Sequence, residues 1–140
     1  MLPENAEWVA LWLLHARSDL ALASAPPPPG VLNAQLCFHA QEAAEKALKA
    51  VLVCLDVSFP RTHDIAALAA LLPDSVGVPP GLQRARQLTA YATQLRYPGA
   101  AEPVAEDERT AAVLVASQVV EWAERITSAS GEEDSVQTHG

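Results

Sequence analysis

The sequence predicts an all-α protein, an up-and-down bundle of about five helices around a four-helix-bundle core. Half of its 140 residues are apolar but only 5% are aromatic, and alanine carries much of the apolar share. Small side chains let helices approach closely, which suits a bundle. Apolar residues recur at helical spacing, and no segment carries a strand signal. We expect one helical domain at residues 1–127, followed by a disordered acidic tail at 128–140.

The first helix is expected at residues 3–24, with Pro3 in its first turn. Its apolar residues repeat at helical spacing: Val9, Leu13, Ala16, Leu20 and Ala23. Trp8 and Trp12 lie one turn apart beside this stripe, and we interpret them as core or subunit contacts. The alternative, stacking on a nucleic-acid base, requires an open cleft that a sequence cannot show. Four prolines at 26–29 are then expected to form a short, stiff loop between antiparallel helices. The alternative is a PxxP ligand for an SH3 or WW domain.

The second helix, at about 31–55, is predicted to be half core and half charged. One side collects apolar residues: Leu36, Ala40, Ala43, Ala44, Ala47, Ala50, Val51 and Cys54. The opposite side carries Glu42, Glu45 and Lys49, with His39 and Lys46 at the border. That charged side is either a solvent face or part of a site. Cys37 and Cys54 would lie about 25 Å apart on this helix, too far to bridge, so we expect reduced thiols.

A third, short helix is expected at 62–72, with Thr62 as its N-cap and Asp64 in its first turn. His63 would then lie at a helix N-terminus, where backbone N–H groups attract anions, and Arg61 adds positive charge. The alternative is that Arg61 is solvated and His63 packs on a neighbouring helix.

A loop at 73–81 leads to a fourth helix at about 82–95. Pro98 keeps Tyr97 out of the helical region, so Arg96 falls in the last turn and Tyr97 in the exit loop. The last helix is expected at about 106–128. Its buried stripe is Val113, Ala116, Val120, Ala123 and Ile126, with Trp122 at the edge.

The candidate site is a set of cationic and polar side chains that converge between helices. Each also has an ordinary structural explanation, but together they suit a phosphate-bearing ligand. The set is Lys46, Lys49, Arg61, His63, Arg96 and Tyr97. We expect no metal site and no cofactor, because the sequence lacks a Cys/His cluster at zinc spacing, a glycine-rich phosphate loop and a nucleophile elbow.

The charge balance and hydropathy limit the partners. A net charge of −8 argues against broad, charge-driven nucleic-acid binding, although a local basic patch stays open. The first twenty residues lack the basic leader of a signal peptide, and no apolar run is long enough for a membrane span. We therefore expect a soluble, cytoplasmic protein with no membrane partner.

Three motifs resemble the HEPN family (higher eukaryotes and prokaryotes nucleotide-binding). They are FHAQEAAEKALKAVL at 38–52, FPRTHDIAAL at 59–68 and LTAYATQLRYP at 88–98, and the opening AEWVALWLLHARSDLALA at 6–23 is similar to the family's first helix. The resemblance implies a helical bundle that often forms homodimers. It also implies a prokaryotic setting, often beside a small nucleotidyltransferase in a toxin–antitoxin-like pair.

Many members of the wider superfamily are metal-independent ribonucleases with an Arg, four to six residues, and then a His. No arginine here satisfies this spacing. The eligible positions hold Ala101, Glu102 and Pro103 after Arg96, Ala66, Ala67 and Leu68 after Arg61, and Leu22, Ala23 and Ser24 after Arg17.

The sequence therefore favours a non-catalytic module that offers Lys46, Lys49, Arg61, His63, Arg96 and Tyr97 to a nucleotide or other phosphate ligand. Two alternatives stay open. One is a divergent HEPN ribonuclease in which His63 acts as acid or base and Arg96 stabilises charge on the phosphate. The other is a dimeric adaptor that binds a protein partner.

Overall fold

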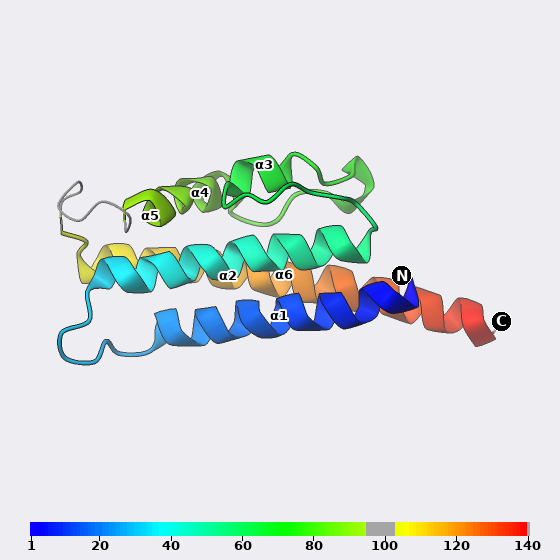
Figure 1. Ribbon diagram of the computed structural model, residues 1–140, viewed down its shortest axis with the longest axis horizontal. Coiled ribbons are helices and arrows are strands. Elements are labelled where there is room, and N and C mark those ends of the chain that lie inside the picture. Colours follow the sequence, from blue (N-terminus) through cyan, green and yellow to red (C-terminus); the bar gives the residue numbers. More distant parts are fainter. Residues whose placement is uncertain (95–102, 140) are drawn as a thin grey trace.

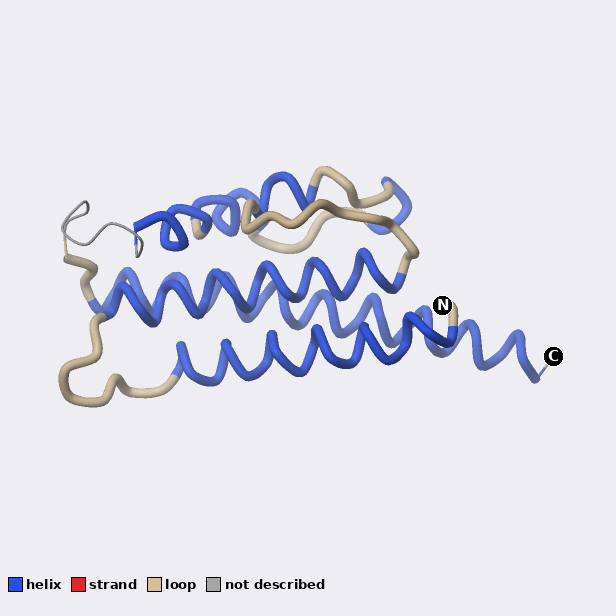
Figure 2. The backbone as a smooth tube through the Cα atoms, viewed as in Figure 1, coloured by secondary structure: helices blue, strands red, loops and turns tan. Residues whose placement is uncertain are grey.

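The computed structural model describes residues 1–94 and 103–139, and this part of the chain is all helical (Figures 1 and 2). The predicted all-α class is confirmed. The elements are α1 (Pro3–Ser24), α2 (Asn33–Cys54), α3 (Ile65–Ala69), the 3₁₀ helix η1 (Asp74–Val76), α4 (Leu82–Gln87), α5 (Thr89–Gln94) and α6 (Glu106–His139). In the described ranges, no helix has the length and apolar character needed to cross a membrane.

The helices run up and down, with α2 at the centre. α1 is antiparallel to α2, whereas α6 runs parallel to α2 (Figure 1). The short helices α3 to α5 run back along α2 as a broken fourth member, on the side away from α1 (Figure 1). α2 therefore contacts α1, α6, α3 and α5.

This central place buries α2 on nearly all sides. Alanines at the contacts have no exposed surface, which lets the neighbouring helices approach closely: Ala40, Ala43, Ala44, Ala47 and Ala50. The charged side of this helix was predicted to be either a solvent face or part of a site. It is not a solvent face at Gln41, Glu45 and Lys49, because these side chains are buried as well. The hydrophobic periodicity of α2 alone could not show that the following chain folds back over the polar side of this helix.

The C-terminus of α2 forms a Schellman motif. The N–H of Val57 donates to Leu52 O (2.8 Å), and the N–H of Asp56 donates to Val53 O (3.1 Å). Asp56 itself has φ 58°, which is the left-handed conformation that glycine usually adopts at this position of the motif. The chain is thereby turned across α2 and towards α3.

The third helix is shorter than predicted, and its cap is different. α3 spans only Ile65–Ala69, and Asp64 is the N-cap, with its side chain accepting the N–H of Ala66. Thr62 instead accepts the N–H of Asp64 (3.0 Å), which makes a turn ahead of the helix. Thr62 is therefore not the N-cap, because an aspartate two residues later performs that function.

The predicted fourth helix is two helices, α4 and α5, which are separated at Leu88. The hydroxyl of Thr89 accepts the N–H of Ile65 (3.1 Å), so the start of α5 is bound to the start of α3. Arg96 and Tyr97 lie outside the described residues.

α6 continues to His139, whereas the sequence predicts disorder over 128–140. Among the side chains described, Thr127 is the last buried one in α6. Once a helix is nucleated, each further residue adds a backbone hydrogen bond, so the packed part of α6 can extend past its core contacts.

Candidate functional site

The buried carboxylate of Glu45 organises the polar residues beneath the segment 56–64. Its Oε2 accepts a hydrogen bond from Lys49 Nζ (2.8 Å), and its Oε1 lies 2.8 Å from His63 Nδ1. Gln41 Nε2 donates both to Glu45 Oε1 (3.1 Å) and to His63 O (3.0 Å). Gln41, Glu45 and Lys49 are successive residues one turn apart on α2. The same helix face therefore holds His63 both by its imidazole ring and by its backbone carbonyl.

A second group lies beside the first, between α1 and α2. Asp19 of α1 accepts a hydrogen bond from Lys46 Nζ (2.6 Å) and lies 3.0 Å from His39 Nδ1. Lys46 also pairs with Glu42 (3.5 Å). Burial lowers the pKa of Lys46, but the hydrogen bond and charge of Asp19 outweigh it, and the pKa lies above its ordinary value.

Glu42 links the two groups. Its Oε1 is 3.8 Å from His63 Nδ1 and has no hydrogen-bond partner although it is buried. Burial, followed by the charge of Glu45, raises the pKa of Glu42 above its ordinary value. Lys46 and His63 act in the opposite direction but do not cancel this shift.

Among the described residues, Glu42, Glu45 and His63 have ligand atoms within 4.8 Å of one another, the spacing of a cation site. Lys46 and Lys49 already neutralise the two carboxylates. The local charge therefore offers little attraction to a metal ion.

The structure brings three of the six predicted site residues, Lys46, Lys49 and His63, into this polar cluster. Both lysines are largely buried and paired with carboxylates, while the His63 side chain is 55% exposed. Arg61 is exposed and makes no hydrogen bond or ion pair with any described residue.

The central residues of the cluster were not among the predicted site residues. They are Gln41, Glu45 and, in the second group, Asp19 and His39. The available signal was the i, i+4 spacing of Gln41, Glu45 and Lys49, which favours side-chain pairing along a helix.

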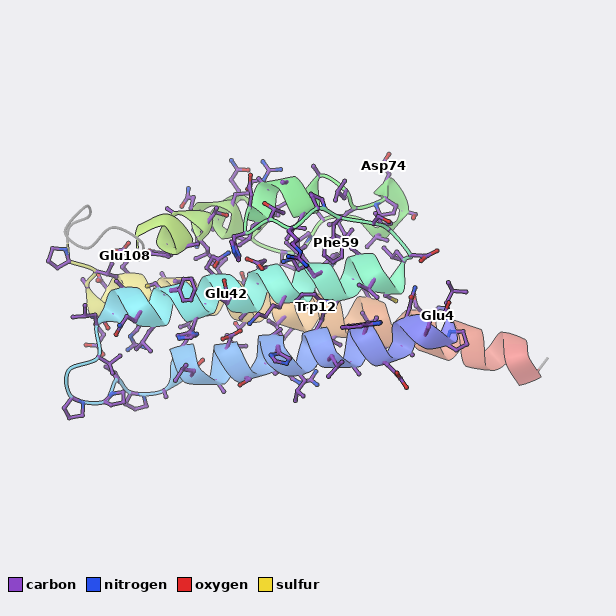
Figure 3. The ribbon with its side chains drawn as sticks, in the orientation of Figure 1. Glu4, Trp12, Glu42, Phe59, Asp74 and Glu108 are labelled. Atoms are coloured by element: carbon purple, nitrogen blue, oxygen red, sulfur yellow. The ribbon has the colours of Figure 1, made fainter. Side chains whose placement is uncertain are left out.

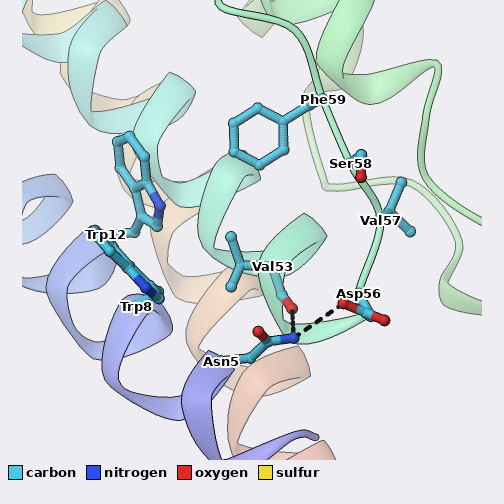
Figure 4. A pocket seen from close by; sticks show the side chains of 8 residues that line it. All are labelled: Asn5, Trp8, Trp12, Val53, Asp56, Val57, Ser58 and Phe59. Carbon is cyan, nitrogen blue, oxygen red and sulfur yellow. Dashed lines mark hydrogen bonds between the residues drawn. The ribbon is translucent and has the colours of Figure 1, made fainter.

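An open pocket adjoins the cluster, between α1 and the chain that leaves α2 (Figure 4). Its volume is about 260 Å³, and it is lined by Asn5, Trp8, Trp12, Val53, Asp56, Val57, Ser58 and Phe59. Figure 3 shows Trp12 on α1, Glu42 on α2 and Phe59 on the following loop. Lys49 connects the pocket to the cluster, because its Nζ lies 5.3 Å from the centre of the Trp12 ring.

Comparisons with known proteins identify the fold and the family. The chain is similar to a solved structure of TT1696 from Thermus thermophilus, with 33% identity, a TM-score of 0.58, and 89% of this chain and 96% of that one covered. It is also similar to ST0689, an archaeal HEPN homologue, with 26% identity, a TM-score of 0.50 and the same coverage of 89% and 96%. No curated protein matches the sequence.

A family model described as the HEPN domain matches residues 9–126, which is nearly all of the packed chain. This match includes the helices that carry the polar cluster and most of the residues that line the pocket. The chain belongs to the HEPN domain family.

Proposed function

We propose that this HEPN domain is a non-catalytic module that binds a nucleotide or another phosphate-bearing ligand on the segment 59–64. The observation that carries the proposal is that two side chains two residues apart are available to a ligand. Arg61 is exposed and has no partner among the described residues, and His63 is partly exposed with its ring held by Glu45. Guanidinium groups bind phosphate oxygens in a fixed geometry. An imidazole that is already oriented loses less freedom when it binds.

Within this proposal the two side chains that touch the ligand are Arg61 and His63. Lys46 and Lys49 act indirectly, because both are paired with carboxylates and hold Glu42 and Glu45 in place. Arg96 and Tyr97, which lie outside the described residues, are kept as proposed contributors from the sequence.

The test is calorimetric binding of a panel of nucleoside mono-, di- and triphosphates to the purified protein. We expect Arg61→Ala and His63→Ala each to weaken binding about tenfold, as loss of one charged hydrogen bond implies. Arg84→Ala is the matched control, because Arg84 is an exposed arginine on α4. If no nucleotide in the panel gave a heat of binding or raised the thermal unfolding temperature of the protein, the proposal would lose its main support.

We further propose that the module works as a cytoplasmic homodimer, and that it is paired with a small nucleotidyltransferase in a toxin–antitoxin-like system of a prokaryote. The apolar side chains exposed on α1 support an interface. Co-expression with a neighbouring nucleotidyltransferase and recovery of a complex on size exclusion would test the pairing. A genome without such a neighbour would count against it.

One observation favours a second candidate, a divergent metal-independent ribonuclease. The 2.8 Å contact between Glu45 Oε1 and His63 Nδ1 is the carboxylate–imidazole arrangement that orients a general acid or base. Cleavage of RNA in the presence of EDTA, abolished by His63→Ala, would establish catalysis and overturn the non-catalytic proposal. The third candidate, a dimeric adaptor that binds a protein partner, requires neither ligand binding nor cleavage. A wild-type protein that neither binds nucleotides nor cleaves RNA would favour it.

A further inference from the structure

The pocket beside the polar cluster has aromatic walls. Trp8 and Trp12 of α1 stand on one side, and Phe59 faces them from the loop (Figure 4). The Trp12 and Phe59 rings meet edge to face, with centres 6.4 Å apart, while Trp8 is 59% exposed. Such rings offer stacking surface to a planar ligand. At about 260 Å³ the space suits one ring system, because larger ligands use pockets of roughly 300–1,000 Å³.

One end of the pocket presents a fixed carboxylate. Asn5 Nδ2 donates to Val53 O (3.0 Å) and to Asp56 Oδ1 (3.3 Å), so Asn5 fixes Asp56 against the end of α2 (Figure 4). The left-handed backbone at Asp56 sets the direction from which its side chain leaves the chain. An ionised carboxylate only accepts hydrogen bonds, so this end favours a ligand edge that donates them.

The opposite end of the pocket lies near two basic residues, of which Lys49 is paired with Glu45. Phe59 lies at this end in Figure 4, and the Nζ of Lys49 is 5.9 Å from the centre of its ring. Arg61 follows Phe59 by two residues and has no partner in the described chain. A ligand with N–H donors on one edge and a phosphate on the other side would match this polarity.

We propose that this pocket is the base subsite for a nucleotide and that it prefers guanine. Guanine is flat, and it carries a ring N–H beside an amino group, so it can donate two hydrogen bonds to the Asp56 carboxylate. Its ring would stack against Trp8, and its sugar and phosphate would extend past Phe59 towards Arg61. This inference rests on the proposed function, because it assumes that Arg61 receives the phosphate of the same ligand.

The test separates base from phosphate by using three probes in calorimetry: guanosine, adenosine and ribose 5-phosphate. We expect guanosine to bind more tightly than adenosine. Trp8→Ala should weaken guanosine binding about tenfold, within the range measured for loss of one stacked base. Leu114→Ala is the control, because Leu114 is an exposed apolar residue on α6 and does not line the pocket.

Asp56→Asn is the sharper variant, because asparagine also adopts the left-handed conformation and keeps an oxygen for Asn5. It should remove the preference for guanosine over adenosine without unfolding the chain, and it carries the test if Trp8→Ala is unstable. Unchanged guanosine affinity in Asp56→Asn would overturn the proposal.

The remaining outcomes distinguish the two proposals. Binding of ribose 5-phosphate through Arg61 without binding of guanosine would overturn the base subsite and leave the proposed function standing. Binding of guanosine that depends on Trp8 and Asp56, without binding of ribose 5-phosphate, would support the subsite and contradict the role of Arg61.

Discussion

At the scale of single residues, Glu42 links stability to pH. Its folded-state pKa is raised, mainly by burial and then by Glu45, above the ordinary value of 4.5. The contribution of Glu42 to the free energy of unfolding is therefore fully present below pH 4.5 and is lost as pH rises through the raised pKa. The reason is that the carboxyl group loses its proton at a lower pH in the unfolded chain than in the folded protein. We expect Glu42→Gln to be more stable than the wild type at pH 7 and to lack this decline.

Urea unfolding of the wild type and of Glu42→Gln between pH 4 and pH 8 measures the difference in stability at pH 7 and the change in stability with pH. Glu121→Gln, on the exposed side of α6, is the control and should change the free energy of unfolding by less than about 0.5 kcal/mol. A less stable Glu42→Gln at pH 7 would mean that the pair with Lys46 outweighs the cost of burying the charge.

Lys49 and Glu45 form a buried ion pair, with Nζ to Oε2 at 2.8 Å and the Lys49 ammonium near the rings of Trp12 and Phe59. Removing one partner of such a pair costs about 3–5 kcal/mol, because the other charge is left buried. We expect Lys49→Met to destabilise the protein by about 3 kcal/mol, and the double variant Lys49→Met with Glu45→Gln to recover part of that loss. A double-mutant cycle by urea unfolding measures the coupling, and additive losses would contradict it.

At the scale of elements, the end of α2 depends on one backbone conformation. Asp56 at φ 58° completes the Schellman motif, and β-branched residues tolerate this region poorly. We expect Asp56→Val to lower the free energy of unfolding by about 2 kcal/mol and Asp56→Gly to change it by less than about 1 kcal/mol. Thermal unfolding compares the variants, and equal losses in both would show that the side chain matters more than the conformation.

The sequence predicts long elements well and short ones poorly. The bounds of α1 were predicted to the residue, because Pro3 and the prolines after Ser24 delimit it locally. The broken member from α3 to α5 was not, because contacts such as Thr89 with Ile65 join residues far apart in the chain. Helices this short depend on tertiary packing more than on local propensity.

The candidate site divides in the same way. The pattern of cationic and polar residues pointed to Lys46, Lys49 and His63, which the structure brings into one cluster. It did not point to Glu45, the residue at the centre, because a search for phosphate-binding groups passes over carboxylates. Trp8 lines an open pocket, which the stacking alternative requires, and stacking itself stays a prediction.

At the scale of the whole molecule, the outward side of α1 has the composition of an interface. Leu11, Leu14 and Leu22 are all about half exposed, and their spacings of three and eight place them in a stripe along one side of the helix. Scattered surface leucines are ordinary, but large apolar side chains that gather on one side of a helix mark a surface that can bind a partner. A second copy of this chain would cover it symmetrically.

We therefore expect light scattering after size exclusion to give twice the chain mass of 14.9 kDa. Leu14→Glu should shift the protein to the monomer, because a carboxylate in the middle of the stripe would be buried without a partner. Val78→Glu, at an exposed apolar position in the loop before α4, should leave the mass unchanged. A monomeric wild type would contradict the dimer, and a Leu14→Glu variant that stays dimeric would place the interface elsewhere than on α1.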